Sequence, residues 1–285
     1  NPGQATACCG GNVHRLYPHY VLRMWMKDTK GGLAAVHYGP SRVKTTVGTE
    51  AEPIEIEQRT NYPFEDRIEF VVKSEKAVEF PLSLRIPEWC SAPKIAVNGE
   101  TVAAPKLQKG FAVLERRFKP GDTVTLTLPM RTALSRWPQN GVGVEHGPLV
   151  YALDIQAEWT PIVEARYTTA EYPSWKALPA SAWNYGLAVE EAHLDEQVKV
   201  ERKAMTEDPW VDPPVTLTVP AKKIAGWELQ ANPAKPEQLF TPPLPEVEDH
   251  KVGAEETLTL VPYGSTHLRL TIFPDVGKGE TEDLL

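Results

Sequence analysis

The sequence predicts a mainly β chain in which one helix near the start is followed by two antiparallel β-sandwich domains. Apolar residues recur with a helical period in one segment only, close to the first residue. From Leu33 onward they instead alternate with polar residues, as in half-buried strands. The chain also carries 27 prolines among 285 residues, roughly twice the usual frequency. Because proline is excluded from the interiors of helices and central strands, many short elements are expected.

The helix is indicated by an apolar stripe with the i, i+3, i+4, i+7 spacing. The stripe consists of Val13, Leu16, Tyr17, Tyr20, Val21 and Met24. Asn12 has a side chain that suits the N-cap position, so the helix is expected to begin there. Pro18 is expected to kink the helix or to begin a second one, and Gly31-Gly32 to end the helical segment.

The first sandwich is expected at residues 27–131. Its strands are indicated by alternating apolar residues, namely Ile54, Ile56, Ile68, Phe70, Val72, Leu82, Leu84, Ile86, Ile95, Val97, Val124, Leu126 and Leu128. Asn98-Gly99 and Pro120-Gly121-Asp122 are turn signals between these strands. Short alternating strands joined by such turns are typical of an antiparallel sandwich.

The second sandwich is expected at residues 132–285. Residues 147–153 and 215–219 are apolar runs that suit strands, and further strands are expected on both sides of a turn at residues 262–265. Long loops rich in proline and acidic residues are expected at 204–214 and 232–257, and loops of that length are usually functional or extend over a neighbour.

Composition excludes several function classes. Hydrophobic residues make up 41% of the chain and charged residues 24%, which is typical of a globular protein. The net charge of -8 argues against a nucleic-acid partner, which requires a basic face. No apolar run approaches the roughly 18 residues that a membrane span needs, so no membrane partner is expected. Because the chain opens without an initiator methionine, a fragment of a longer protein is expected.

Cys8 and Cys9 stand side by side just ahead of the predicted helix. On the dipeptide alone, packing is the commoner role, because free cysteine is usually buried; the same role is expected for Cys90. The functional alternative is a thiolate stabilised by the helix N-terminus, with Gly10-Gly11 allowing a ligand or metal to approach the backbone. Two thiolates could reach one zinc ion, but they supply only half of its tetrahedral shell.

A series of motifs, in order from Ala5 to about Pro274, resembles the C-terminal half of the β-L-arabinofuranosidase family, glycoside hydrolase family 127 and its relatives (formerly domain of unknown function family 1680). The motifs are CCGGNVHR, YVLRMWMKD, LSLRIPEWC, IAVNGE, FKPGDTVTLTLPM, EHGPLVYALD and LTLVPYGSTHLRLTIFP. The resemblance implies an (α/α)6-barrel catalytic domain followed by two β-sandwich domains. Residues 1–26 would then be the C-terminal end of that barrel, most of which is absent.

The resemblance further implies a retaining hydrolase of β-L-arabinofuranosides or related plant-polysaccharide sugars. By motif match, Cys8 would be the catalytic nucleophile and a zinc ligand, and Cys9 a second zinc ligand. Zinc is the implied cofactor, with its remaining ligands, a further cysteine and a glutamate, expected upstream of Asn1 together with the acid/base glutamate. The expected partners are a carbohydrate substrate and the missing N-terminal barrel. The chain alone is expected to be inactive, and the resemblance favours a periplasmic or secreted location.

An alternative reading is a non-catalytic β-sandwich module that scaffolds or binds carbohydrate. It is motivated by the missing acid/base and by four scattered tryptophans, Trp159, Trp175, Trp183 and Trp210. Exposed indoles could stack on sugar rings, but tryptophan usually fills cores, so burial is expected. Glu88, Glu145 and His14 are not assigned to catalysis, because both glutamates are expected to be solvated and His14 lies off the apolar stripe.

Overall fold

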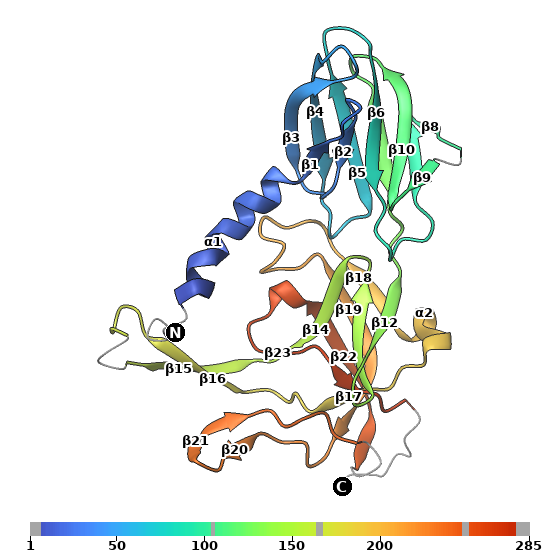
Figure 1. The fold of residues 1–285 in the computed structure, drawn as a ribbon. Helices are drawn as coiled ribbons and strands as arrows, with labels where there is room; N and C mark the ends of the chain where they lie inside the picture. Colours follow the sequence, from blue (N-terminus) through green and yellow to red (C-terminus); the bar gives the residue numbers. More distant parts are fainter. Residues whose placement is uncertain (1–6, 104–105, 164–167, 247–250, 278–285) are drawn as a thin grey trace. The chain divides into compact units, whose positions relative to one another are not determined.

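The computed structural model describes residues 7–103, 106–163, 168–246 and 251–277 (Figure 1). The chain divides between Met130 and Arg131 into two compact units, called here the first and the second unit in chain order. Strands dominate both, which confirms the mainly β class. Within the described ranges, no helix is long and apolar enough to cross a membrane. The assignment of residues 1–26 to a helical barrel stays a prediction.

Helix α1 runs from Ala7 to Leu22 and therefore begins earlier than expected. The prediction that Asn12 caps the helix is wrong, because Asn12 lies in its second turn. Gly10 and Gly11 each cost only about 1 kcal/mol relative to alanine in a helix, so the helix continues through them. Pro18 lies inside α1, and the helix ends well before Gly31-Gly32.

Two sheets build the first unit, with strand orders β1-β2-β6-β10-β9 and β3-β4-β5-β11-β7-β8. Their bounds are β1 Trp25–Lys27, β2 Leu33–Ala35, β3 Ser41–Val47, β4 Glu52–Thr60, β5 Arg67–Lys73, β6 Val78–Arg85, β7 Lys94–Val97, β8 Glu100–Thr101, β9 Lys106–Gln108, β10 Phe111–Phe118 and β11 Thr123–Thr127. One pair departs from the expected antiparallel pattern, because Leu33 of β2 pairs with Leu82 of β6 in parallel.

The core of the first unit lies between these sheets and follows the predicted alternation. On β4, Ile54 and Ile56 are buried while Glu55 and Glu57 point to the opposite face. The largest fully buried side chains of this core include Phe70, Phe80, Phe118, Ile56, Ile68, Leu82, Leu84, Ile95 and Leu126. Burial of such a set is the main favourable contribution to the stability of a sandwich.

Two predicted turns of the first unit are tied together by side chains. Asn98 and Gly99 have φ angles of 53° and 84° and close the β7–β8 hairpin, as an Asn-Gly turn does. Asn98 Nδ2 donates to Asp122 Oδ1 over 2.8 Å, and the Lys119 N–H donates to Asp122 Oδ2 over 2.8 Å. Asp122 is buried and comes directly after Gly121, whose φ is 86°. This carboxylate therefore joins both turns.

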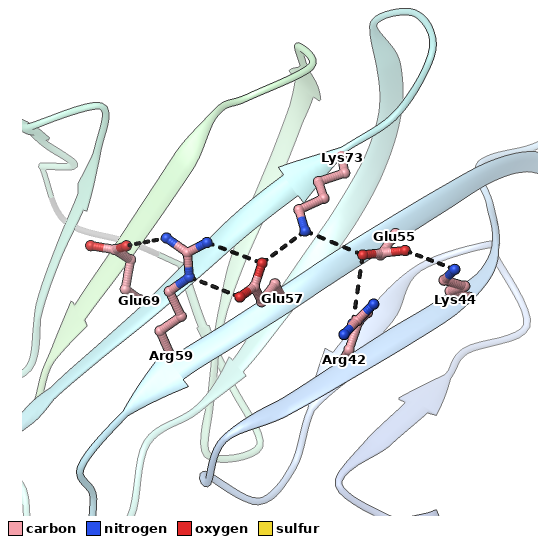
Figure 2. A network of polar contacts seen from close by, with 7 residues as sticks. All are labelled: Arg42, Lys44, Glu55, Glu57, Arg59, Glu69 and Lys73. Atoms are coloured by element: carbon pink, nitrogen blue, oxygen red, sulfur yellow. Dashed lines mark hydrogen bonds and ion pairs between the residues drawn. The ribbon is translucent and has the colours of Figure 1, made fainter.

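The outer face of β3, β4 and β5 carries a network of ion pairs, called here the charge ladder (Figure 2). At its centre, Lys73 Nζ lies 2.8 Å from Glu57 Oε2 and 3.3 Å from Glu55 Oε1. Arg59 Nε donates to Glu57 Oε1 over 3.0 Å. The hydrogen bond from Arg59, and then that from Lys73, lower the pKa of Glu57 to about 2. The remaining members are Arg42, Lys44 and Glu69.

The second unit is built on a nine-stranded sheet. Its path is β12-β13-β14-β22-β19-β17, and β18, β23 and β24 pair with β19, β14 and β13. The bounds are β12 Thr132–Trp137, β13 Gly141–His146, β14 Leu149–Asp154, β17 Tyr185–Leu187, β18 Lys199–Arg202, β19 Val215–Ile224, β22 Val252–Pro262, β23 Arg269–Leu270 and β24 Phe273–Pro274. The predicted runs at 147–153 and 215–219 fall on β14 and β19, so both strand predictions are confirmed.

Among the described residues, two separate hairpins and three short helical segments complete the second unit. The hairpins are β15 Ala157–Ile162 with β16 Ser174–Pro179, and β20 Gln230–Asn232 with β21 Lys235–Phe240. The helical segments are η1 Glu191–His193, α2 Leu194–Gln197 and η3 Tyr263–Ser265. The turn expected at residues 262–265 is thus confirmed as η3. Figure 1 shows the β15–β16 hairpin extending away from the nine-stranded sheet.

Candidate active site

The two cysteines predicted for the site lie in the first turn of α1, rather than ahead of the helix. Their side chains lie outside the part of the structure that is described, so their predicted contacts stay predictions. The backbone position still has a chemical consequence. The N–H groups of a first turn carry partial positive charge and favour a thiolate over a thiol. No acidic residue in the first turn of α1 competes for that charge.

Helix α1 is fixed to the first unit at its C-terminal end. The Tyr20 ring stacks on the His37 ring with centroids 4.7 Å apart and planes inclined by 24°. The Val36 N–H donates to the Met24 carbonyl over 2.8 Å, and the Met24 side chain is buried. Burial, and then the positive charge of Arg85, lower the pKa of His37, so the stacked imidazole is neutral at neutral pH.

Most of the predicted apolar stripe on α1 is not buried. Leu16, Tyr17 and Val21 are each more than half exposed, and Met24 beyond the helix end is the stripe member that enters the interior. An apolar stripe on a helix normally faces a core. The described part of this chain does not provide one for the stripe.

The described residues hold no zinc site of their own. Among them, no group of three His, Cys, Asp or Glu side chains could hold a metal ion. Cys90 is buried in the core of the first unit, as expected for a packing cysteine. His14 and Glu88 are exposed, and Glu145 is half-buried on β13. The described side chains thus contribute no ligand set, and the assignment of Cys8 and Cys9 as zinc ligands stays a prediction.

Sequence reasoning missed a polar cluster around the buried His146 in the second unit. Arg202 Nη2 lies 3.1 Å from His146 Nε2, and Thr132 Oγ1 lies 3.1 Å from His146 Nδ1. Because a guanidinium only donates, Nε2 must accept, which places the imidazole proton on Nδ1. Burial, and then the charge of Arg202, lower the pKa of His146 to about 4. The motif EHGPLVYALD contains His146 but gives no sign of Arg202, which lies 56 residues further on.

The expectation of buried tryptophans is wrong for three of the four singled out. Trp159, Trp175 and Trp210 are exposed, whereas Trp183 is half-buried with its ring centroid 4.9 Å from that of the buried Trp227. The difference lies in the supporting structure, because Trp159 and Trp175 stand on a two-stranded hairpin that has no second layer among the named sheets.

Comparison with known proteins identifies the first sandwich. Residues 32–130 match the family model for the beta-L-arabinofuranosidase GH127 middle domain. The expected resemblance to GH127 is confirmed. No match was found among curated proteins.

Solved structures agree with this assignment over nearly the whole chain. A GH127 beta-L-arabinofuranosidase from Geobacillus stearothermophilus T6 superposes with a TM-score of 0.65 at 22% identity, covering 96% of this chain and 38% of its own. A GH127 beta-arabinofuranosidase matches with a TM-score of 0.63 at 21% identity over 96% of this chain and 39% of that one. At these identities the likeness shows the fold. The chain spans about two fifths of the length of these proteins.

Proposed function

We propose that this chain is the C-terminal part of a retaining glycoside hydrolase acting on β-L-arabinofuranosides or related plant-polysaccharide sugars. The observation that carries the proposal is the match of residues 32–130 to the GH127 middle domain. The solved structures of that fold are more than twice as long as this chain, which leaves room for a catalytic domain outside it.

The exposed stripe of α1 supports the same proposal. Leu16, Tyr17 and Val21 expose apolar surface to solvent. Burying that surface against another domain would be favourable in free energy. A helical domain packed on this side of α1 would bury these three residues. It would also enclose the first turn of the helix, where Cys8 and Cys9 stand.

In the proposed reaction, Cys8 is the nucleophile. Its thiolate attacks the anomeric carbon, so that a C–S bond forms while the glycosidic C–O bond breaks. A carboxylic acid from outside this chain donates its proton to the leaving oxygen and then takes one from the water that displaces the sulfur. Two displacements at the same carbon retain its configuration. Zinc held by Cys8 and Cys9, together with ligands from outside the chain, would supply positive charge that keeps the thiols ionised.

The test is release of para-nitrophenol from para-nitrophenyl β-L-arabinofuranoside, with zinc and a reductant present. We expect no turnover by this chain and turnover by a longer version that includes the upstream helical domain. Cys8→Ser in the longer protein should abolish turnover. Cys90→Ser is the matched control, because this thiol is buried in the core of the first unit. A Cys8→Ser enzyme that keeps its rate would refute the cysteine nucleophile.

Metal binding is tested separately from turnover. Cobalt(II) bound by thiolates gives a sulfur-to-metal charge-transfer absorption, whose intensity scales with the number of thiolate ligands. We expect this band in the longer protein, weakened by Cys8→Ser or Cys9→Ser and unchanged by Cys90→Ser. A band that keeps its full intensity in both first-turn variants would place the metal elsewhere.

A further inference from the structure

The β15–β16 hairpin presents one face without any charged residue. In the register of the hairpin, Trp159 lies opposite Ala177 and Trp175 lies opposite Pro161. Paired residues and residues two apart share a face, so one side of the hairpin consists of Ala157, Trp159, Pro161, Trp175, Ala177 and Pro179. The charged residues Glu158 and Lys176 belong to the other side. The hairpin therefore has one uncharged face, and its other face mixes charged, polar and apolar residues.

Both indoles on this face are accessible. Trp159 is 47% exposed and Trp175 is 56% exposed. They are diagonal neighbours on adjacent strands. The Cα atoms of such neighbours lie about 7–8 Å apart. Each indole also faces a small or rigid residue across the hairpin rather than a long side chain. The hairpin thus presents two accessible indoles on the same face, called here the platform.

Contacts from the rest of the second unit extend this platform. The His267 ring packs edge-on against Trp159, with centroids 6.1 Å apart and planes at 89°. His267 follows η3, whose exposed Tyr263 ring is covered on one side by the Arg269 guanidinium at 3.8 Å from the ring centroid. These contacts fix the orientations of Trp159 and Tyr263 before any ligand arrives, which lowers the entropy cost of binding.

A third indole borders the same turn. The Trp210 ring lies against Gly264 so closely that a Cβ on Gly264 would come within 2.8 Å of Trp210 Cε3. A glycine is therefore required beside Tyr263 for this indole to pack there. Trp210 remains exposed despite this contact. We define the aromatic surface as Trp159, Trp175, Trp210, Tyr263 and His267.

We propose that the aromatic surface binds a neutral carbohydrate polymer, separately from any catalytic centre. Sugar rings present C–H groups that pack on the negative face of an aromatic ring. The hairpin face is uncharged, which suits a neutral ligand, and the net charge of -8 on the chain disfavours an acidic polysaccharide. The choice of a carbohydrate rests on the proposed function, whereas the location of the surface rests on the structure of the second unit.

The test is retardation of this chain in native gels that contain soluble neutral arabinan or arabinoxylan, followed by titration calorimetry with the polymer that retards it. Trp159→Ala and Trp175→Ala should each raise the dissociation constant by about threefold to tenfold, the size expected for one aromatic contact. Trp175→Phe should largely restore binding because it keeps a ring. Trp137→Ala is the matched control, since Trp137 is 52% exposed on β12 and lies outside the aromatic surface.

Each outcome decides the proposal. Binding that weakens in the two hairpin variants and not in Trp137→Ala supports it. Absence of retardation by both polymers, or equal binding by all variants, overturns it. If light scattering shows a dimer that Trp175→Ala converts to a monomer, a second copy occupies the surface and the proposal is wrong. Because hydrolysis is assayed on the longer protein, failure of binding here is distinct from failure of the proposed reaction.

Discussion

Tyr20 on α1 and His37 after β2 stack ring on ring with their centroids 4.7 Å apart. This contact joins the helix that begins with the cysteine pair to the sandwich that matches the GH127 middle domain. It therefore links the proposed nucleophile to the part of the chain whose fold is most firmly assigned. The stripe residues Leu16, Tyr17 and Val21 are more exposed than Tyr20, and each is more than half exposed.

Removal of the Tyr20 ring should loosen the helix without unfolding the sandwich. Tyr20→Ala is expected to cost about 1 kcal/mol of docking free energy, the size of one aromatic pair. Hydrogen exchange of the α1 amides should accelerate, while the β4 and β5 amides stay protected. Tyr17→Ala is the matched control on the same helix, since Tyr17 is 67% exposed and Tyr20 44%. Equal acceleration in both variants would show that the stacking contact does not hold α1.

Acid should destabilise the second unit through His146. Because folding lowers its pKa to about 4 from the usual value near 6.5, the unfolded chain binds the proton more readily between these values. Stability is thus expected to fall as the pH drops from about 6.5 towards 4. Urea unfolding across this range measures the slope, and His146→Leu should flatten it. An NMR titration of His146 with a midpoint above 6 would contradict the prediction.

The junction formed by the hydrogen bond between Asn98 and Asp122 should stabilise the first unit against unfolding. Asp122→Ala leaves the Asn98 amide and the Lys119 N–H without their acceptor, at an expected cost of about 1–3 kcal/mol. Asp122→Asn keeps one acceptor oxygen and should cost less. Burial opposes ionisation, but the hydrogen bonds from Asn98 and Lys119 lower the pKa of Asp122 overall. Its contribution is therefore present above the usual carboxyl pKa and is lost as the pH falls below it.

Urea unfolding of the wild type and both variants checks this ordering. The pH dependence of wild-type stability in the acid range should shrink in Asp122→Asn, which has no carboxyl group at this position. A variant as stable as the wild type at neutral pH would contradict the proposed role of the junction.

The charge ladder should lower the pKa of one of its carboxylates, that of Glu57. Glu57 is expected to titrate at about pH 2 because hydrogen bonds from Arg59 and Lys73 stabilise its ionised form. Side-chain carbon NMR measures this midpoint directly. Arg59→Gln should raise it, and so should about 1 M salt, which shortens the screening length to about 3 Å. A midpoint near the ordinary glutamate value at low salt would show that the ladder is not formed.

Local signals predicted much of the first unit. Alternation of Ile54 and Ile56 with glutamates gives β4, and Asn98-Gly99 gives the β7–β8 hairpin, because both signals act between near neighbours in sequence. The start of α1 was misplaced because Asn12 suits a cap but nothing in its neighbours prevents the helix from beginning at Ala7. The parallel pairing of β2 with β6 depends on residues about fifty positions apart, which alternation does not report.

The candidate sites were predictable to different degrees. The cysteine pair stands out in the sequence, and its place in the first turn of α1 agrees with a thiolate site in physical terms. The exposure of Trp159 and Trp175 was not predictable, because it depends on the register of a separate two-stranded hairpin. The His146–Arg202 contact likewise arises from two strands that are distant in sequence.

The position of β3 at one end of its sheet gives the charge ladder a further consequence (Figure 2). The outermost strand of a sheet offers unpaired backbone groups on which another chain can extend the sheet, a common start of aggregation. Arg42 and Lys44 of β3 are exposed on that strand. A second molecule that added a strand there would have to accommodate these two long charged side chains, both of which are paired with Glu55. We therefore expect the ladder to disfavour the addition of a strand at this edge of the sheet.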